Sequence, residues 1–332
     1  MSTQTPWLSV LVAAYNAENY LQICIDSMQL ENNRDIQLII VDDGSTDGTP
    51  IICEQAASKF SNIEVVHKPN GGTTSARNAG LPLVRSEWVW FVDADDVVSP
   101  DAFDLLKPVL NRTKSQLIHF NFEFFRNSDT PDWTLRPKSS HAVTTIDAAQ
   151  FLHGTYDGTF RRFDCSFVYS KEALSLAARS LGRCIDNLFY TDIILYEDVL
   201  FCETLCRVIS TVDFLDERIY GCRHVVTSMT NKKSDKSAAS GLKAIRMINE
   251  FDSLPSDRSV KAMMEMGLLF HAYGLTENRS SSGALRSEIK KEIKNCCRSV
   301  RFSQLSRKLK IQYILLVTRT IDFAVWARDV LR

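Results

Sequence analysis

Short runs of apolar, β-branched and aromatic residues alternate with segments of helical periodicity along the N-terminal third of the chain. Runs of this length and composition predict buried strands. The alternation of strand and helix predicts an α/β fold, built on a mainly parallel sheet with helices on both faces. The four predicted strands cover residues 8–14, 37–41, 63–67 and 88–92.

Polar residues follow three of these runs. Tyr15 follows the first run, Asp42 and Asp43 follow the second, and the sequence Asp-Ala-Asp-Asp follows the fourth at residues 93–96. The carboxyl ends of strands in an open α/β sheet are where ligands bind. Paired carboxylates at such an end suit a divalent metal that holds a diphosphate, because hard cations take carboxylate and phosphate oxygens together. A solvated acidic turn that caps the next helix explains the same residues without a ligand.

The rest of the chain is patterned differently. Residues 117–124 alternate apolar and polar side chains, which predicts a half-exposed strand, and the polar segment 127–145 predicts a loop. A charged stretch at 232–240 predicts a domain boundary, after which helical patterns run to the end of the chain.

Composition narrows the class of protein. A chain of 332 residues with 45% apolar side chains has room for a large core and about two domains, and its net charge of −1 argues against a nucleic-acid partner. Nine cysteines without any Cys-x-x-Cys spacing favour reduced thiols over a zinc site. Because there is no secretory signal and no apolar run near the ~20 residues that span a bilayer, we expect a cytoplasmic protein.

The C-terminal end is basic although the whole chain is not. Residues 286–332 hold twelve Lys or Arg and four Asp or Glu, an excess of eight positive charges. Residues 311–326 are amphipathic and too charged to span a membrane, so an anionic surface at the cytoplasmic face of a membrane is a candidate partner. A helical subdomain that packs on the N-terminal core accounts for the same pattern.

Four motifs of the N-terminal third resemble those of family-2 glycosyltransferases in their order and spacing. Agreement of four separated motifs is more specific than any one short pattern. The clear resemblance covers residues 6 to 110, and a thinner one continues to 230. The motifs are Ser9–Asn16, Val41–Asp47, Ala76–Gly80 and Asp93–Asp96.

This resemblance implies a GT-A fold with a Rossmann-like sheet, a nucleotide-sugar donor, a divalent metal (Mn²⁺ or Mg²⁺) and inversion at the anomeric carbon. It also implies a donor-binding half at residues 1–110 and an acceptor-binding, catalytic half at 111–231. The basic, amphipathic helical region at 232–332 follows them.

The resemblance also assigns roles to the polar strand ends. Asp43 is expected to accept a hydrogen bond from the uracil ring N–H, with Tyr15 stacked near the base, and Asp42 is expected to support this loop. Arg77 is expected to hold the acidic turn, residues 93–96, in place. A core aromatic and a surface charge are the ordinary explanations of Tyr15 and Arg77. The implied donor and metal residues are Ala13, Tyr15, Asp42, Asp43, Arg77, Asp93 (at the ribose) and Asp95 (at the metal).

Two acids, Glu197 and Asp198, lie at the start of a predicted helix further along the chain. Acids in a first helical turn commonly complement the helix dipole. The stretch Tyr196–Phe201 also resembles the family segment with a Glu-Asp pair, whose Asp is the general base. The resemblance therefore implies that Asp198 is the catalytic base and that Glu197 supports it.

The segment Tyr220–Thr230 resembles the one that closes over the diphosphate in this family. Arg223 and Ser228 fall in register with it, whereas Val225 stands where a second basic residue is frequent. His224 lies beside Arg223 and is a candidate phosphate or metal ligand. A lone His is just as often a packed or surface residue.

We therefore expect a hexosyltransferase that moves a sugar from a UDP-sugar to a hydroxyl of a glycan or lipid-linked acceptor, in surface polysaccharide or glycolipid synthesis. Asp198 would take the acceptor proton, while metal at Asp95, assisted by Arg223 or His224, would stabilise the leaving diphosphate.

Two other functions share these features. A non-catalytic nucleotide-sugar sensor or scaffold on the same fold needs no base. The sequence has both Asp198 and Asp95, which favours the enzyme. A nucleotidyltransferase would need a glycine-rich, basic phosphate loop after the first strand, and Tyr15–Glu18 is not such a loop.

Overall fold

The computed structural model describes residues 5–126, 130–133, 142–224, 234–251, 258–276, 282–300, 302–317 and 321. Val225 and Ser228 lie outside these residues, as do the predicted boundary at 231–232 and most of the predicted loop at 127–145. The chain divides into two compact units. Unit 1 comprises residues 1–152, 161–191 and 201–226, and unit 2 comprises residues 153–160, 192–200 and 227–332.

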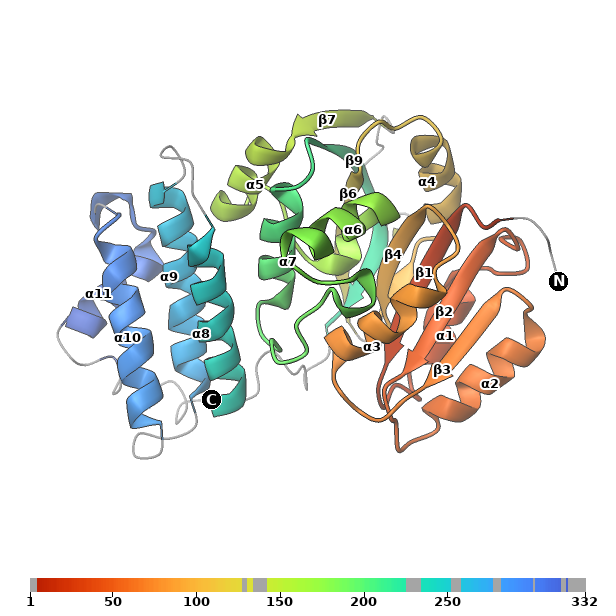
Figure 1. The fold of residues 1–332 in the computed structure, drawn as a ribbon, viewed down its shortest axis with the longest axis horizontal. Coiled ribbons are helices and arrows are strands. Elements are labelled where there is room, and N and C mark those ends of the chain that lie inside the picture. The colour runs from red at the N-terminus through yellow and green to blue at the C-terminus, as the bar shows by residue number, and fades with distance from the viewer. Residues whose placement is uncertain are drawn as a thin grey trace. The chain divides into compact units, whose positions relative to one another are not determined.

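Four parallel strands form the N-terminal half of unit 1, in the spatial order β3-β2-β1-β4 (Figure 1). All four predicted strands are confirmed. β1, β2 and β4 are buried along nearly their whole length, whereas β3 lies at the edge of the sheet and is buried only at Ile63. Their bounds are Leu8–Ala14 for β1, Ile36–Asp42 for β2, Ile63–His67 for β3 and Trp88–Asp93 for β4.

Three helices cover one face of this sheet: α1 (Leu21–Ser27), α2 (Thr49–Lys59) and α4 (Ala102–Leu110). They share one apolar core with the side chains that β1 and β4 direct to this face, among them Val10 and Trp90.

Helix α3 (Thr73–Gly80) covers the opposite face. A Cβ added at Gly80 would lie 2.6 Å from Leu11 Cδ1, so the glycine allows this helix to approach β1 closely. Helices on both faces of a parallel sheet confirm the predicted α/β fold.

Beyond β4 the sheet becomes mixed. β8 (Phe167–Ser170) runs antiparallel to both β4 and β6 (Leu117–Phe125). β9 (Thr211–Arg223) is parallel to β6, and it is antiparallel to β5 (Val97–Val98) and β7 (Val143–Asp147). The described residues thus form one nine-stranded sheet, which is parallel throughout its N-terminal part and mixed beyond it.

Strand β6 is more buried than its sequence pattern predicts. Residues 117–120 are buried, and exposure begins only at Asn121. β6 is paired with β8 on one side and with β9 on the other. The ring of His119 is buried in the core, where its Nε2 lies 2.8 Å from the carbonyl oxygen of Arg161. The prediction of a half-exposed strand is therefore wrong for its first half, because a polar residue that finds a hydrogen bond can be buried.

Trp90 lies at the centre of the core of unit 1. Its ring packs edge-on against Phe103 and Phe120, with centroids 6.1 Å and 5.2 Å away, and its Nε1–H donates to the carbonyl oxygen of Cys165. The acidic turn therefore extends from a rigid strand. The other helices of this part of the chain are α5 (Ala148–Asp157), α6 (Lys171–Ser180) and α7 (Glu197–Cys206), with 3₁₀ turns at Leu81–Leu83, Asp164–Ser166 and Ile185–Asn187.

Unit 2 contains the C-terminal helices, which confirms the predicted helical region. α9 contacts each of the other three, and Ser234 caps α8 by accepting a hydrogen bond from the N–H of Ser237. No helix among the described residues is long and apolar enough to cross a membrane. The helices are α8 (Asp235–Glu250), α9 (Arg258–Leu275), α10 (Gly283–Cys297) and α11 (Arg307–Val317), with a 3₁₀ turn at Phe302–Gln304.

Candidate active site

The parallel strands bring their acidic ends to one edge of the sheet. In the register of the sheet, Ala14 of β1 is opposite Asp42 of β2, and Ala13 is opposite Asp93 of β4. Since β2, β1 and β4 are neighbours, the polar residues that follow them meet at the edge where ligands bind in open α/β sheets.

Asp42 is buried and paired with a histidine. Its carboxylate accepts from the N–H of Ser45 and lies 2.8 Å from Nδ1 of His67, whose Nε2 is 3.0 Å from Glu54 of α2. Burial alone would raise the pKa of Asp42, but these hydrogen bonds hold it below its usual value, and the two carboxylates raise the pKa of His67. Asp42 therefore contacts the loop that follows β2 through Ser45, and its predicted supporting role remains a prediction.

Asp43 anchors the loop after β3. Its carboxylate accepts from Lys68 Nζ at 2.5 Å and from the N–H groups of Gly71 and Gly72 at 3.0 and 2.6 Å. Gly44 has a φ of +75°, and a Cβ there would lie 2.7 Å from the backbone nitrogen of Asn70, so the two loops are packed closely. The predicted uracil contact of Asp43 remains a prediction, and this geometry adds Lys68 to the same region.

Tyr15 is not a core aromatic, since its side chain is 52% exposed. The next residue, Asn16, has a φ of +49°, and its Oδ1 accepts from the N–H of Thr46 at 2.8 Å. This bond ties the end of β1 to the loop after β2 and leaves the Tyr15 ring at the edge of the sheet. A ring in this position is available to stack on a base.

Asp96 is the buried, structural member of the acidic turn. It accepts from Tyr220 Oη at 2.6 Å and from the N–H of Arg223 at 2.7 Å, and Tyr220 Oη accepts from the N–H of Asp93. Burial, together with the nearby carboxylates of Asp93 and Asp95, raises the pKa of Asp96 well above its usual range. β9 thus fixes the conformation of the turn.

Asp95 lies in the same turn and is less enclosed. Burial and then the charge of Asp93 raise the pKa of Asp95 to about 6, against the smaller opposing effect of Arg223. Arg223 Nε donates to the backbone carbonyl of Asp95 at 2.8 Å, and the guanidinium lies over the rings of Tyr20 and Phe125, 5.1 and 4.5 Å from their centroids. An arginine held in this way presents a fixed positive charge beside the carboxylates.

Arg77 is buried, so the alternative of a surface charge is wrong. Its guanidinium is paired with the buried carboxylate of Asp164 and lies 3.5 Å from Asp93. It also packs against the rings of Phe91 and Phe189, 5.2 and 5.7 Å from their centroids. A permanent cation beside Asp93 is what the predicted role in holding the acidic turn requires.

The donor set of the turn fits a hard divalent cation. Asp93, Asp96 and Cys165 place one possible ligand atom each within 4.8 Å of one another. Burial raises the pKa of the Cys165 thiol, so it stays protonated and is a poor ligand, and Asp96 is already bound by Tyr220 and Arg223. The carboxylates left for a cation are those of Asp93 and Asp95, and their mutual repulsion is what a cation would relieve.

Three further residues were predicted from the family resemblance: Glu197, Asp198 and His224. Glu197 and Asp198 form the first turn of α7 in unit 2, where Asp198 Oδ1 accepts from the N–H of Val199 at 2.8 Å. His224 is exposed, and its backbone N–H donates to the carbonyl of Phe125. The predicted roles of these three residues remain predictions.

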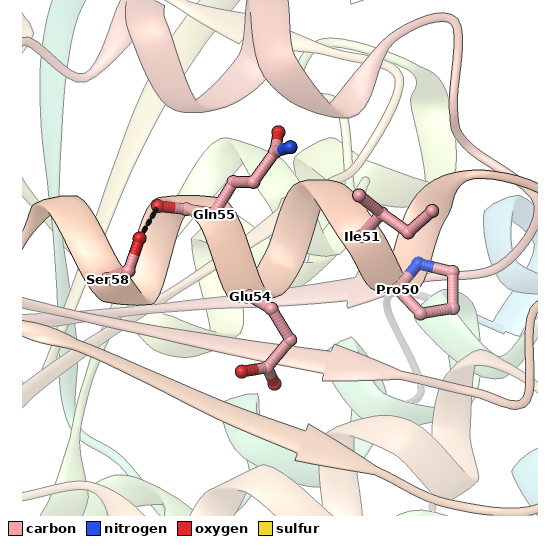
Figure 2. A pocket seen from close by; sticks show the side chains of 5 residues that line it. All are labelled: Pro50, Ile51, Glu54, Gln55 and Ser58. Carbon is pink, nitrogen blue, oxygen red and sulfur yellow. Dashed lines mark hydrogen bonds between the residues drawn. The ribbon is translucent and has the colours of Figure 1, made fainter.

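A hollow of about 440 Å³ on the outer face of α2 is a weaker candidate for a ligand site. Figure 2 shows that its lining comes from one helix, without the converging polar groups that ligand sites need. The lining residues are Pro50, Ile51, Glu54, Gln55 and Ser58.

Three residues of the site were not predicted. Lys68 directly follows β3. A basic residue at the end of a strand whose neighbour ends in acidic residues was a usable signal. Tyr220 begins the segment that the resemblance singled out, but nothing in the sequence linked it to Asp96, 124 residues away, or linked Asp164 to Arg77, 87 residues away. Only the folded sheet brings these pairs together.

Comparison with known proteins points to one family. Residues 9–175 match the family model described as "Glycosyl transferase family 2". The chain is 29% identical to the uncharacterized glycosyltransferase EpsJ of Bacillus subtilis over 68% of this chain and 63% of that protein. It is 30% identical to the putative glycosyltransferase EpsH of the same organism over 52% of this chain and 49% of that protein. The match thus spans 63% and 49% of the length of these two relatives.

Solved structures agree on the fold. Residues 1–349 of S. aureus TarS superpose with a TM-score of 0.65 at 17% identity, over 95% of this chain and 88% of that one. The mannosyltransferase PcManGT from Pyrobaculum calidifontis gives a TM-score of 0.54 at 14% identity, over 99% and 87%. At such identities the likeness shows the GT-A-type fold alone. From the match over half of its length, the chain belongs to glycosyl transferase family 2.

Proposed function

We propose that this protein is an inverting, metal-dependent hexosyltransferase that moves a sugar from a UDP-sugar to a hydroxyl of a glycan or lipid-linked acceptor, in surface polysaccharide or glycolipid synthesis. The proposal is carried by one observation: three neighbouring strands end at the same edge of the sheet. Asp43 and the acidic turn lie at this edge, and Arg223 donates a hydrogen bond to the backbone of the turn. Structures of S. aureus TarS with UDP-GlcNAc and with UDP support the donor class. Relatives named as a hyaluronan synthase and a minor teichoic acid biosynthesis protein support a glycan acceptor.

The acidic turn and Arg223 handle the diphosphate in this proposal. Asp95, with Asp93 beside it, would hold Mn²⁺ or Mg²⁺. The structure of PcManGT is a complex with GDP-Man and Mn²⁺, which supports a divalent metal. A divalent cation supplies neutralisation of charge on the leaving diphosphate. Arg223, kept in place by two aromatic rings and a backbone carbonyl, adds a positive charge that needs no reorganisation during the reaction.

The reaction needs a base for the acceptor. Asp198 takes the proton of the acceptor hydroxyl while its oxygen bonds to the anomeric carbon, and the bond from that carbon to the diphosphate oxygen breaks with its electron pair leaving on the diphosphate. Attack on the face opposite the leaving group inverts the anomeric configuration. General-base assistance of this kind contributes ~10²–10⁴-fold to the rate.

The substitution Asp198→Asn tests the enzyme against a sensor on the same fold. It keeps the size of the side chain but cannot take a proton, so transfer should fall by ~10² or more, with kcat and kcat/KM falling together. Binding of UDP-sugar with Mn²⁺, measured by calorimetry or by thermal stabilisation, should be unchanged.

The exposed Asp192, which is paired with Lys243 in the same unit, gives a matched control. Asp192→Asn should leave both transfer and binding unchanged. Full transfer by Asp198→Asn would reject the base, and lost donor binding would move Asp198 into the donor site.

The basic helix α11 supports a proposed location on the cytoplasmic face of a membrane. Arg307 and Lys308 are exposed on this helix together with Ile311 and Ile314. A basic surface with apolar side chains fits an anionic lipid surface, where a lipid-linked acceptor would be found.

A further inference from the structure

Tyr196 has a backbone conformation that its side chain does not favour. Its φ is +66°, in the left-handed region where bulky residues are uncommon and glycine is usual. It immediately precedes Glu197, and its carbonyl accepts the N–H of Leu200 at 3.0 Å, the first hydrogen bond of α7. Such a conformation persists only where the surroundings hold it, and strained residues of this kind cluster at functional sites.

Helix α9 holds the Tyr196 side chain. The side chain is buried, and its Oη lies 2.7 Å from the carbonyl oxygen of Leu268 and 2.8 Å from Nδ1 of His271. A carbonyl can only accept, so the phenol proton goes to Leu268 and the Nδ1–H of His271 donates to the phenol oxygen. The hydroxyl is therefore fixed both as a donor and as an acceptor on one turn of α9.

Helix α8 holds the backbone that leads into Tyr196. Ser240 Oγ accepts from the N–H groups of Ile194 and Leu195, at 2.7 and 3.3 Å. A Cβ at Gly241 would lie 2.9 Å from Tyr196 Cε2, so the glycine allows the ring to lie against α8. The contacts of Tyr196 with α9 and of its preceding backbone with α8 all lie within unit 2, which also contains Asp198.

We propose that Tyr196 is a positioning residue for the base. The left-handed turn at residue 196 sets the direction in which α7 begins, and therefore the direction of the Asp198 carboxylate two residues later. Tyr196 itself needs no contact with substrate, because it acts through Asp198. The inference rests on the proposed role of Asp198, and it gives the C-terminal helices α8 and α9 a part in catalysis.

The substitution Tyr196→Phe tests the proposal, because it removes the hydroxyl that α9 holds and keeps the ring. We expect kcat to fall ~10- to 100-fold, since a small misplacement of a catalytic group has an effect of this size, while the Kd for UDP-sugar with Mn²⁺ stays unchanged. In the background of Asp198→Asn, Tyr196→Phe should cause no further loss, because no base is left to position.

Tyr273→Phe is the matched control, since it removes a buried phenol from α9 whose ring lies against Arg286 and Lys290. It should keep full activity. Ser240→Ala, which releases the backbone on the other side, should repeat the loss in kcat and serves if Tyr196→Phe does not fold.

Two results would overturn the positioning role: full activity of both Tyr196→Phe and Ser240→Ala, or an equal loss from Tyr196→Phe with and without Asp198. Full activity of Asp198→Asn is a different failure, since it rejects the base and the proposed mechanism with it.

Discussion

Asp95 carries a charge that the metal-free protein does not stabilise well. Its pKa is raised from 3.8 to about 6 on folding, so the folded protein binds a proton that the unfolded chain has already lost. The stability gained from this proton is fully present below pH 3.8 and is lost as the pH rises through about 6. A divalent cation should act in the opposite direction, stabilising the protein only where Asp95 is ionised.

Thermal melting of the metal-free protein between pH 4 and 8 checks this argument. The stability of the wild type should fall across this range by up to ~3 kcal/mol more than that of Asp95→Asn, at ~1.4 kcal/mol per pKa unit. Added Mn²⁺ should raise the melting temperature of the wild type above pH 6 and should not stabilise the variant. Parallel pH curves for the two proteins, or an equal response to Mn²⁺, would contradict the assignment.

At the scale of residues, sequence reasoning succeeded where chemistry sits next to a strong local pattern. Asp42 and Asp93 directly follow apolar runs, so their place at the edge of the sheet follows from the strands. Other contacts of the site depend on tertiary packing: nothing local in the sequence links Tyr220 to Asp96, or Asp164 to Arg77.

At the scale of elements, β9 is bound to the turn after β4 by the phenol of Tyr220 and by two hydrogen bonds from Arg223. Tyr220→Phe removes the hydroxyl bound to both Asp96 and Asp93, so it should cost about 1–3 kcal/mol of stability and weaken donor binding. Denaturant unfolding and UDP-sugar titration measure the two effects. Tyr169→Phe, which loses a buried bond to the Asp164 carbonyl instead, should lose stability with less effect on donor binding. Equal effects on binding would show that the β9 contact has no special role.

The approach of α3 to β1 gives a second prediction at this scale. Gly80→Ala places a methyl group 2.6 Å from Leu11 Cδ1, and such overpacking should destabilise the protein by ~1–3 kcal/mol. Gly267, within α9, has no atom within 4 Å of an added Cβ, so Gly267→Ala should stabilise by ~0.5–1 kcal/mol. Chemical denaturation measures both, and destabilisation by both variants would contradict the packing argument.

The same scale shows where patterns failed. The apolar runs predict the parallel strands because burial on both faces leaves a continuous signal. β6 was misjudged because its alternation concealed a buried His119 with a hydrogen-bond partner. The antiparallel pairing of β8 between β4 and β6 joins residues 48 to 82 positions apart, and periodicity carries no information on such pairings.

At the scale of the whole molecule, the helical C-terminal region was predictable from its pattern. Which upstream segments belong to unit 2 was not predictable. Residues 153–160 and 192–200 belong by their contacts with the C-terminal helices, although they lie far upstream. The predicted boundaries at 110 and 231 therefore stay predictions. The surface of α11 is the feature of unit 2 that bears on location, because its Ile311 and Ile314 side chains are half exposed beside a basic first turn.

Binding to anionic vesicles tests that location. The full chain should bind vesicles that contain phosphatidylserine, and the binding should fall steeply with salt because exposed charges are screened over ~8 Å at physiological ionic strength. Replacing both Ile311 and Ile314 by Ser should weaken it further, since each removes exposed apolar area that the lipid would bury. Ile51 is the matched control: it is 62% exposed on α2 beside Glu54 (Figure 2), so Ile51→Ser should leave vesicle binding unchanged. If the double variant bound as well as the wild type at every salt concentration, α11 would not be the membrane contact. The alternative, in which its apolar residues serve the packing of a helical subdomain, would then be favoured.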